Sequence, residues 1–122
     1  MSRASQQTVR VLDGSYVLER RAGGTDVVPG ADVLAMVFGP DGCTVVRRDD
    51  TGEEAWSALW NGDAAHEVEA TGMLSAIVTP LATGGLPVWV ASSYDGDLIL
   101  VPADRLDEAS AVLEAAGHHV RR

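Results

Sequence analysis

The sequence has 122 residues, of which 46% are hydrophobic and 22% are charged, a composition typical of one medium-sized folded domain or of two small ones that share a core. Eighteen acidic residues against nine basic ones give a formal net charge of −9, which argues against nucleic-acid binding because phosphates need clustered cations to replace their counterions. The single cysteine, Cys43, excludes an internal disulfide and a cysteine-based metal cluster, and its place in an apolar run predicts a packed thiol.

The N-terminal segment carries no targeting or membrane signal. Residues 1–7 are polar, and we expect them to form a frayed tail. No run approaches the roughly 18 apolar residues of a membrane span, and no apolar signal segment follows the start. We therefore expect a cytoplasmic protein that does not contact a membrane.

Short apolar runs separated by glycine-containing turns predict a first half built of β-strands. Two of these runs flank Gly39-Pro40-Asp41-Gly42, and this arrangement predicts a hairpin. The run at 55–60 fits either a strand or a helix, and Asn61-Gly62-Asp63 after it is the predicted joint between the two halves. The predicted strands of the first half are 8–12, 16–20, 33–38 and 43–47, with at most one helical turn at 26–32.

The second half opens with a predicted strand at 65–71, followed by an amphipathic helix with one buried face. Pro80 lies inside this helix and cannot donate a hydrogen bond to the carbonyl of Ala76, so we expect a bend there or a shortened last turn. Gly84-Gly85 is predicted to end the helix. The apolar positions, spaced i, i+3, i+4 and i+7, are Leu74, Ile77, Val78 and Leu81.

Two further runs, 88–91 and 98–101, are apolar at successive positions and predict strands buried on both faces. The sheet face that the helices leave open should therefore be covered as well. A second copy of the protein is the simplest cover, so we expect a homodimer.

A second helix is predicted after Pro102, with Asp104 as its N-cap and Asp107 at the third helical position. Gly117 is predicted to end the helix, and residues 118–120 to form a last short strand. The predicted buried stripe of this helix is Leu106, Ala109, Leu113 and Ala116.

The order of the elements predicts an α+β fold made of two ferredoxin-like (βαββαβ) units. The second half reads strand, helix, strand, strand, helix, strand, and the first half is a degenerate copy of the same plan. Short right-handed crossovers would place the helices of each unit on one face of an antiparallel sheet. The predicted units are residues 8–62 and residues 63–122.

The second half contains a set of recognisable motifs: Thr71-Gly72-Met73-Leu74-Ser75, Pro80-Leu81-Ala82, residues 86–97, Leu100-Val101-Pro102 and residues 113–120. These motifs resemble the ACT domain, and more narrowly the tandem-ACT proteins related to the CASTOR arginine sensors, including small bacterial members. The resemblance is strong from about 72 to 120 and weaker but collinear from about 12 to 60. It implies two ACT units, the first one degenerate, with an amino acid bound where the units meet, and regulation by ligand binding instead of catalysis.

The resemblance also implies a ligand site, at the positions of this sequence that match the family's motifs. The helix that begins near Gly72 would offer backbone N–H groups and the positive end of its dipole to an α-carboxylate. Asp95 or Asp97 could hold an α-ammonium by charge-assisted hydrogen bonds. The chain departs from the family at Ser93 and Gly96, where threonine is commoner. The predicted ligand-binding residues are Gly72, Met73, Leu74, Ser93, Tyr94, Asp95 and Asp97.

Each feature also has a purely structural explanation. Gly72 alone fits a tight helix entry, and Asp95-Gly96-Asp97 alone fits hairpin chemistry. The Asp-Gly-Asp string lacks the other ligands at EF-hand spacing, so no metal is expected. The sequence has no Gly-x-Ser-x-Gly elbow for a hydrolase. The histidines are expected to be exposed and the tryptophans to lie in the core: His66, His118, His119, Trp56, Trp60 and Trp89.

The sequence therefore predicts a regulatory module without enzymatic activity or cofactor. Its ligand would be a free amino acid or a similar small zwitterion, and an unidentified protein partner would read the ligand-bound state. The alternative is a ligand-free ACT-like scaffold that mediates dimerisation or protein–protein interaction.

Overall fold

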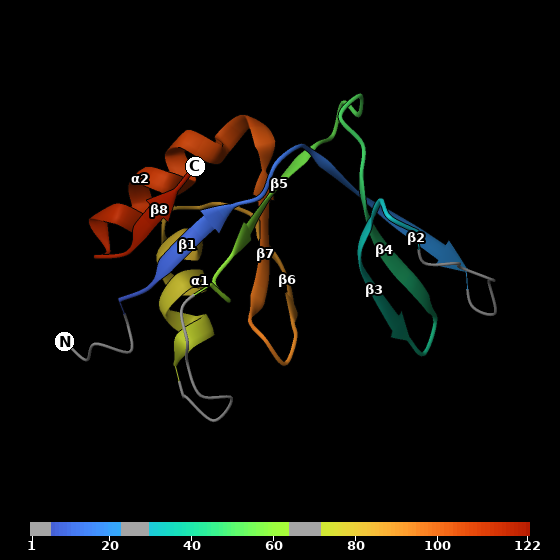
Figure 1. Ribbon diagram of the computed structural model, residues 1–122, viewed down its shortest axis with the longest axis horizontal. Coiled ribbons are helices and arrows are strands. Elements are labelled where there is room, and N and C mark those ends of the chain that lie inside the picture. The colour runs from blue at the N-terminus through green and yellow to red at the C-terminus, as the bar shows by residue number, and fades with distance from the viewer. Residues whose placement is uncertain (1–5, 23–29, 64–71) are drawn as a thin grey trace.

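The computed structural model describes residues 6–22, 30–63 and 72–122, which form one mixed α+β fold with an eight-stranded sheet. The helices lie together on one side of the sheet (Figure 1). The predicted strand at 65–71 and most of the predicted helical turn at 26–32 lie outside the described residues. The elements are β1 (Thr8–Val11), β2 (Tyr16–Ala22), β3 (Val33–Gly39), β4 (Gly42–Arg48), β5 (Trp56–Trp60), α1 (Met73–Thr83), β6 (Trp89–Ser92), β7 (Asp97–Pro102), the 3-10 turn η2 (Ala103–Arg105), α2 (Leu106–Ala115) and β8 (His119–Arg121).

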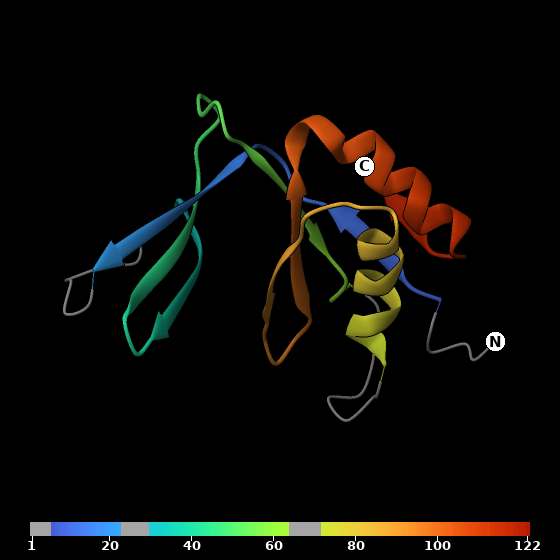
Figure 2. The same ribbon diagram turned by 180° about the vertical axis from the view of Figure 1, so that it is seen from behind.

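The sheet has two parts that meet where β2 pairs with β5. β2 pairs with β4 along its whole length, whereas its pairing with β5 is confined to Tyr16↔Trp56 among the described residues. β5 instead pairs with β7, from Trp56↔Pro102 to Trp60↔Leu98. From this junction, the strands β2, β3 and β4 diverge from the β6–β7 hairpin, as both views show (Figures 1 and 2).

The second part contains the βαββαβ order of a ferredoxin-like unit, in the elements β5, α1, β6, β7, α2 and β8. β1 from the start of the chain is inserted between β5 and β8, antiparallel to β5 and parallel to β8. The run at 55–60, which fits a strand or a helix by pattern, forms a strand at Trp56–Trp60. The division into units 8–62 and 63–122 stays a prediction.

The core between the helices and the sheet is built by alternation along the strands. Ile99 and Val101 of β7 are fully buried and face the helices, where they pack with Ile77, Leu81 and Leu113. Burial of each such side chain contributes about 1.5–3 kcal/mol. The predicted helix faces at positions 77, 81, 109 and 113 are confirmed.

The other face of β7 is covered by the chain itself. Leu98 and Leu100 are buried and pack in a second cluster with Tyr16 and Val46 from β2 and β4. The prediction that this face is covered is confirmed, but these residues need no second copy to be buried, so the homodimer stays a prediction. The three tryptophans are partly buried against the same cluster.

Helix α1 ends as predicted but is not shortened by Pro80. It continues to Thr83, and Gly84 donates its N–H to the carbonyl of Pro80 over 3.0 Å. Gly85 follows with φ 76°, the left-handed backbone that glycine adopts without strain.

Helix α2 differs from its predicted start. Asp104 is not an N-cap: it lies inside the 3-10 turn η2, and α2 begins at Leu106 without a side-chain cap. The turn is held by the N–H of Ala103, which donates to the carbonyl of Ala55 over 3.0 Å, so β7 leads into a 3-10 turn before the helix can form. Gly117, with φ 98°, ends α2 as predicted.

A cluster of charged side chains on β2 and β4 makes stability depend on pH. Glu19 accepts hydrogen bonds from Arg47 Nε over 2.7 Å and from Arg21 Nη2 over 3.0 Å, and these bonds hold the pKa of Glu19 below its ordinary value. A lowered carboxylate pKa stabilises the fold above the ordinary pKa, and that stability is lost as pH falls through the lowered value.

Glu19→Gln is therefore expected to lower the free energy of unfolding by less than about 1 kcal/mol at pH 7, because the ion pairs are partly exposed. Urea unfolding at pH 7 and in acid measures the effect. The difference from the unmodified protein should shrink as pH falls, and a difference that is constant with pH would contradict the assignment.

Candidate functional site

Among the described residues, no side chain compensates the helix dipole at the first turn of α1. Gly72 precedes the helix with φ 79° and is exposed, no side chain caps the N-terminus, and the first turn contains no acidic residue. Helix α2, in contrast, carries Asp107 and Glu108 in its first turn. The start of α1 is thus an exposed, positively polarised end that suits an anionic group.

The β6–β7 turn is closed by its own backbone. The N–H and the Oγ of Ser93 both donate to the carbonyl of Gly96, each over 2.8 Å. Tyr94, at 82% exposure, and Asp95 project from this turn into solvent. Ser93 therefore shapes the turn, and no hydrogen bond within the described part of the chain holds the side chains of Tyr94 and Asp95.

Asp97, the first residue of β7, is oriented by Asn61. Its N–H donates to Asn61 Oδ1 over 2.6 Å, and its Oδ2 accepts from Asn61 Nδ2 over 3.1 Å. Asn61 is only 2% exposed, so this pair of bonds fixes the carboxylate of Asp97 in one direction.

The same asparagine links Asp97 to the start of α1. Asn61 Nδ2 also donates to Gln7 Oε1 over 2.9 Å, and Gln7 Nε2 donates to the carbonyl of Met73 over 2.6 Å. The structure thus brings Met73 and Asp97 into one hydrogen-bonded network. The side chains of Gln7 and Asn61 lie between them, so a ligand that reached both would contact these two amides.

Gln7 corrects the prediction of a frayed tail at residues 1–7. It is buried and its N–H donates to His118 Nδ1 over 3.0 Å; residues 1–5 lie outside the described chain. Neither Gln7 nor Asn61 was among the predicted site residues. Gln7 follows a polar segment, and Asn61 precedes a glycine, so both have the local pattern of solvent-exposed chain.

His118 corrects a second prediction, because it is buried instead of exposed. Nδ1 must accept from the Gln7 N–H, so Nε2 carries the proton and donates to the carbonyl of Ala76 over 2.8 Å. Ala76 is the residue whose helical partner would be Pro80, which has no N–H. His118 therefore satisfies the carbonyl that the proline leaves unpaired. His119 is exposed as predicted, and His66 lies outside the described residues.

Close backbone packing holds the two sides of the network together. A Cβ at Gly96 would lie 2.6 Å from Gly62 Cα and 3.0 Å from Trp60 Cη2. A threonine at position 96, which is commoner in the family that the sequence resembles, would not fit against these atoms. Glycine at both 62 and 96 lets the β6–β7 turn approach the end of β5, which brings Asn61 next to Asp97.

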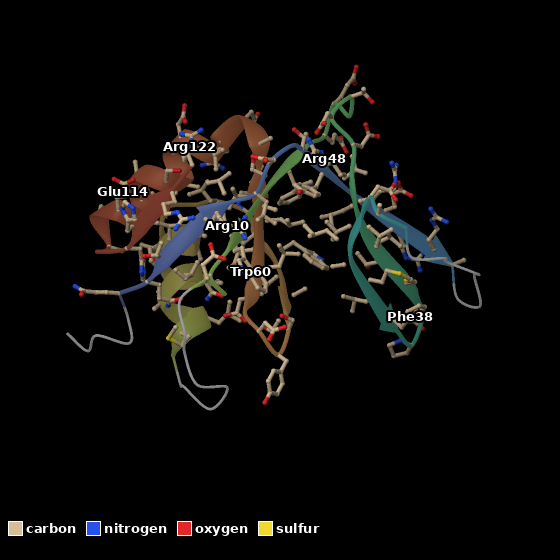
Figure 3. All side chains as sticks on the ribbon, viewed as in Figure 1. Arg10, Phe38, Arg48, Trp60, Glu114 and Arg122 are labelled. Carbon is tan, nitrogen blue, oxygen red and sulfur yellow. The ribbon has the colours of Figure 1, made fainter. Side chains whose placement is uncertain are left out.

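A separate cavity of ≈ 440 Å³ lies between the two parts of the sheet. It is lined by residues 34–37 of β3, by residues 91–93 at the end of β6, and by Trp60 and Leu98. Figure 3 shows Phe38, the residue after this lining segment, at the tip of the β3–β4 hairpin. Ser93 is the one predicted site residue that lines this cavity.

The remaining predicted site residues are dispersed. Leu74 is partly buried and packs against the hydrophobic core, so its side chain is structural, whereas Gly72 and Asp95 are exposed. The described residues contain no group of three or more His, Cys, Asp or Glu side chains placed to hold a metal ion. None of the helices within the described ranges has both the length and the apolar character that crossing a membrane requires. Cys43 is buried, as predicted for a packed thiol.

The βαββαβ order of the second part is that of a small α+β fold of the ferredoxin-like type. The ACT domain family matches residues 51–115, more than half of the chain, and the protein belongs to this family. The match begins before β5, on the N-terminal side of the boundary predicted between 62 and 63. The comparison with curated proteins found no match.

Two solved structures share the fold. The crystal structure of protein Atu0741 from Agobacterium tumefaciens is 24% identical, with a TM-score of 0.81 over 94% of this chain and 92% of that one. The crystal structure of VC0802 from Vibrio cholerae, a protein of unknown function described as a possible transport protein, is 22% identical, with a TM-score of 0.74 over 93% of this chain and 92% of that one. At these identities the likeness is one of fold.

Proposed function

We propose that this protein is a regulatory module that binds a free amino acid or a similar small zwitterion and has no enzymatic activity. The observation that carries the proposal is the uncapped N-terminus of α1, which hydrogen bonds through Gln7 and Asn61 connect to an oriented carboxylate. Gly72 and the first turn of α1 offer uncapped N–H groups to an α-carboxylate, and Asp97, held by Asn61, would receive the α-ammonium. ACT family membership supports a small-molecule regulatory role.

The finer features of the resemblance are part of the same proposal. The chain would be a small member of the tandem-ACT family related to the CASTOR sensors, with units at 8–62 and 63–122. Ser93, Tyr94 and Asp95 would line the turn that faces the ligand. The insertion of β1 between β5 and β8 supports coupling between the units, because a shift of one would move a strand of the other.

A ligand-free scaffold is the second candidate. The observation that favours it is the position of Gln7 and Asn61, whose side chains already connect the Met73 carbonyl to Asp97. In a scaffold, this network would serve stability alone.

Thermal-shift measurements with each of the twenty amino acids separate the two candidates. A ligand at 100 times its dissociation constant stabilises the folded protein by about 2.7 kcal/mol. We expect one amino acid, or one chemical group of them, to raise the melting temperature. If none of the twenty amino acids raises the melting temperature, the result would support the ligand-free scaffold.

Asp97→Ala is expected to weaken binding of the amino acid found in this way by about tenfold or more, because a charge-assisted hydrogen bond is lost. Asp104→Ala, which also removes an exposed-turn carboxylate of the same unit, should leave affinity unchanged. Calorimetry measures both, with unfolding curves to verify that each variant is folded. Equal losses would place the site elsewhere.

A further inference from the structure

The cavity between the two parts of the sheet borders the edges of strands instead of their faces. Side chains of successive strand residues point to opposite faces. Four successive residues of β3, 34–37, nevertheless line the cavity, as do three successive residues, 91–93, on the opposite side. A cavity touched by consecutive residues lies against the backbone edge. We call this cavity, with its two strand edges, the edge slot.

Both strands that border the edge slot are sheet edges. Among the described residues, β3 pairs with β4 alone and β6 pairs with β7 alone. The backbone N–H and C=O groups on the slot side of β3 are therefore available to another extended chain. Trp60 and Leu98 form the apolar floor between the two edges.

The sequence of β3 lacks most features that protect edge strands. Its seven residues, Val33–Gly39, include no charged residue and no proline, and its single bulge is confined to the start of the strand. Val37 and Phe38 are 44% and 68% exposed. Natural edges are usually blunted by Lys, Pro or inward-pointing charges, so an uncharged edge of this length is suited to pairing.

Charge determines which extended chain would fit. Asp32, which forms an ion pair with Arg47 over 3.9 Å, precedes β3 and Asp41 follows it, so antiparallel pairing of two copies would place these two acids beside each other. Asp95 lies in the turn next to the lining residues 91–93 and, like Asp41, forms no ion pair within the described part of the chain. The β3–β4 turn and the β6–β7 turn lie at the same end of their hairpins (Figures 1 and 2), so Asp41 and Asp95 make one end of the slot acidic. With a net charge of −9, the surface repels a second copy and attracts a cation.

We propose that the edge slot binds an extended peptide segment of a partner protein, with alternating apolar residues at its centre and Lys or Arg at the end that reaches the two acidic turns. The segment adds a strand to β3, its alternate apolar side chains enter the slot over Trp60, and its basic end lies near Asp41 and Asp95. A strand of up to seven residues matches the length of β3. This surface is distinct from the start of α1, so the inference holds whether or not an amino acid binds there.

Selection of a random decapeptide display library on the full-length protein tests the proposal. We expect enriched peptides with period-two apolar residues and Lys or Arg at one end. Synthetic copies should change the Trp fluorescence, and N-methylation of alternate backbone amides along one edge should abolish binding. No enrichment, no preference for a basic end, or binding that tolerates N-methylation of either edge would overturn the proposal.

Two matched variants locate the surface. Val37→Lys places a charge on the β3 edge and is expected to weaken binding of the selected peptides tenfold or more. Such a tenfold loss corresponds to about 1.4 kcal/mol. Ala111→Lys adds the same charge on the exposed side of α2, away from the residues that line the edge slot, and should change affinity less than about twofold. Equal affinities for both variants would overturn the assignment to the edge slot. If sedimentation showed a dimer that Val37→Lys converts to a monomer, the occupant of the edge slot would be a second copy of the chain instead of a partner peptide.

Discussion

His118→Ala is expected to lower the free energy of unfolding by about 3 kcal/mol, whereas His119→Ala should change it by less than about 0.5 kcal/mol. His118 is 5% exposed and bonds the N–H of Gln7 and the carbonyl of Ala76, and each buried polar group left unpaired costs roughly 1–3 kcal/mol. His119 is its exposed neighbour of the same type. Urea denaturation of both variants at one pH measures the difference.

The variant Pro80→Ala tests whether that loss comes from the unpaired carbonyl of Ala76. An alanine at 80 can donate its N–H to the Ala76 carbonyl, so His118→Ala should cost about 1 kcal/mol less in the Pro80→Ala background. A double-mutant cycle gives this coupling energy. If the two changes are additive, His118 stabilises the fold through its bond to Gln7 and through packing, and the proposed replacement of the proline's missing bond is wrong.

Gly96→Ala is expected to destabilise the fold by about 3 kcal/mol, because its Cβ would lie 2.6 Å and 2.9 Å from the backbone Cα and N of Gly62. Backbone atoms cannot move aside as a flexible side chain does. The shift would also separate Asn61 from Asp97, so amino-acid affinity, where binding is found, should fall with stability.

Gly39→Ala is the matched control for this change. The nearest atom to its added Cβ is the carbonyl oxygen of Gly42 at 3.6 Å, an ordinary contact, so its effect should stay below about 1 kcal/mol. Calorimetric unfolding compares the two variants. Similar losses at both positions would contradict the assignment of the loss at 96 to the close approach of Gly62.

Most secondary structure could be predicted from local pattern. The turn between residues 39 and 42 identified the β3–β4 hairpin, and helical spacing identified the buried faces of α1 and α2. The start of α2 could not be predicted in this way. Asp104 has the chemistry of an N-cap, but the bond from Ala103 to Ala55, almost fifty residues away, selects a 3-10 turn instead.

The candidate site was predicted less completely than the fold. The motif at Gly72 located a helix start that is uncapped and exposed, and Asp97 lies in the same network as Met73. Gln7 and Asn61, which connect them, have local patterns of tail and turn, and their burial depends on partners 66 and 36 residues away.

Local residue spacing was enough to predict the hairpins, the helix faces and the ACT resemblance, because each depends on residues within one element or one turn. It could not predict that β1 lies between β5 and β8, that the chain covers its own second face, or that two strand edges border an open slot. These features arise from pairing between distant strands, and the side-chain pattern of a strand states which face is buried without stating which partner buries it.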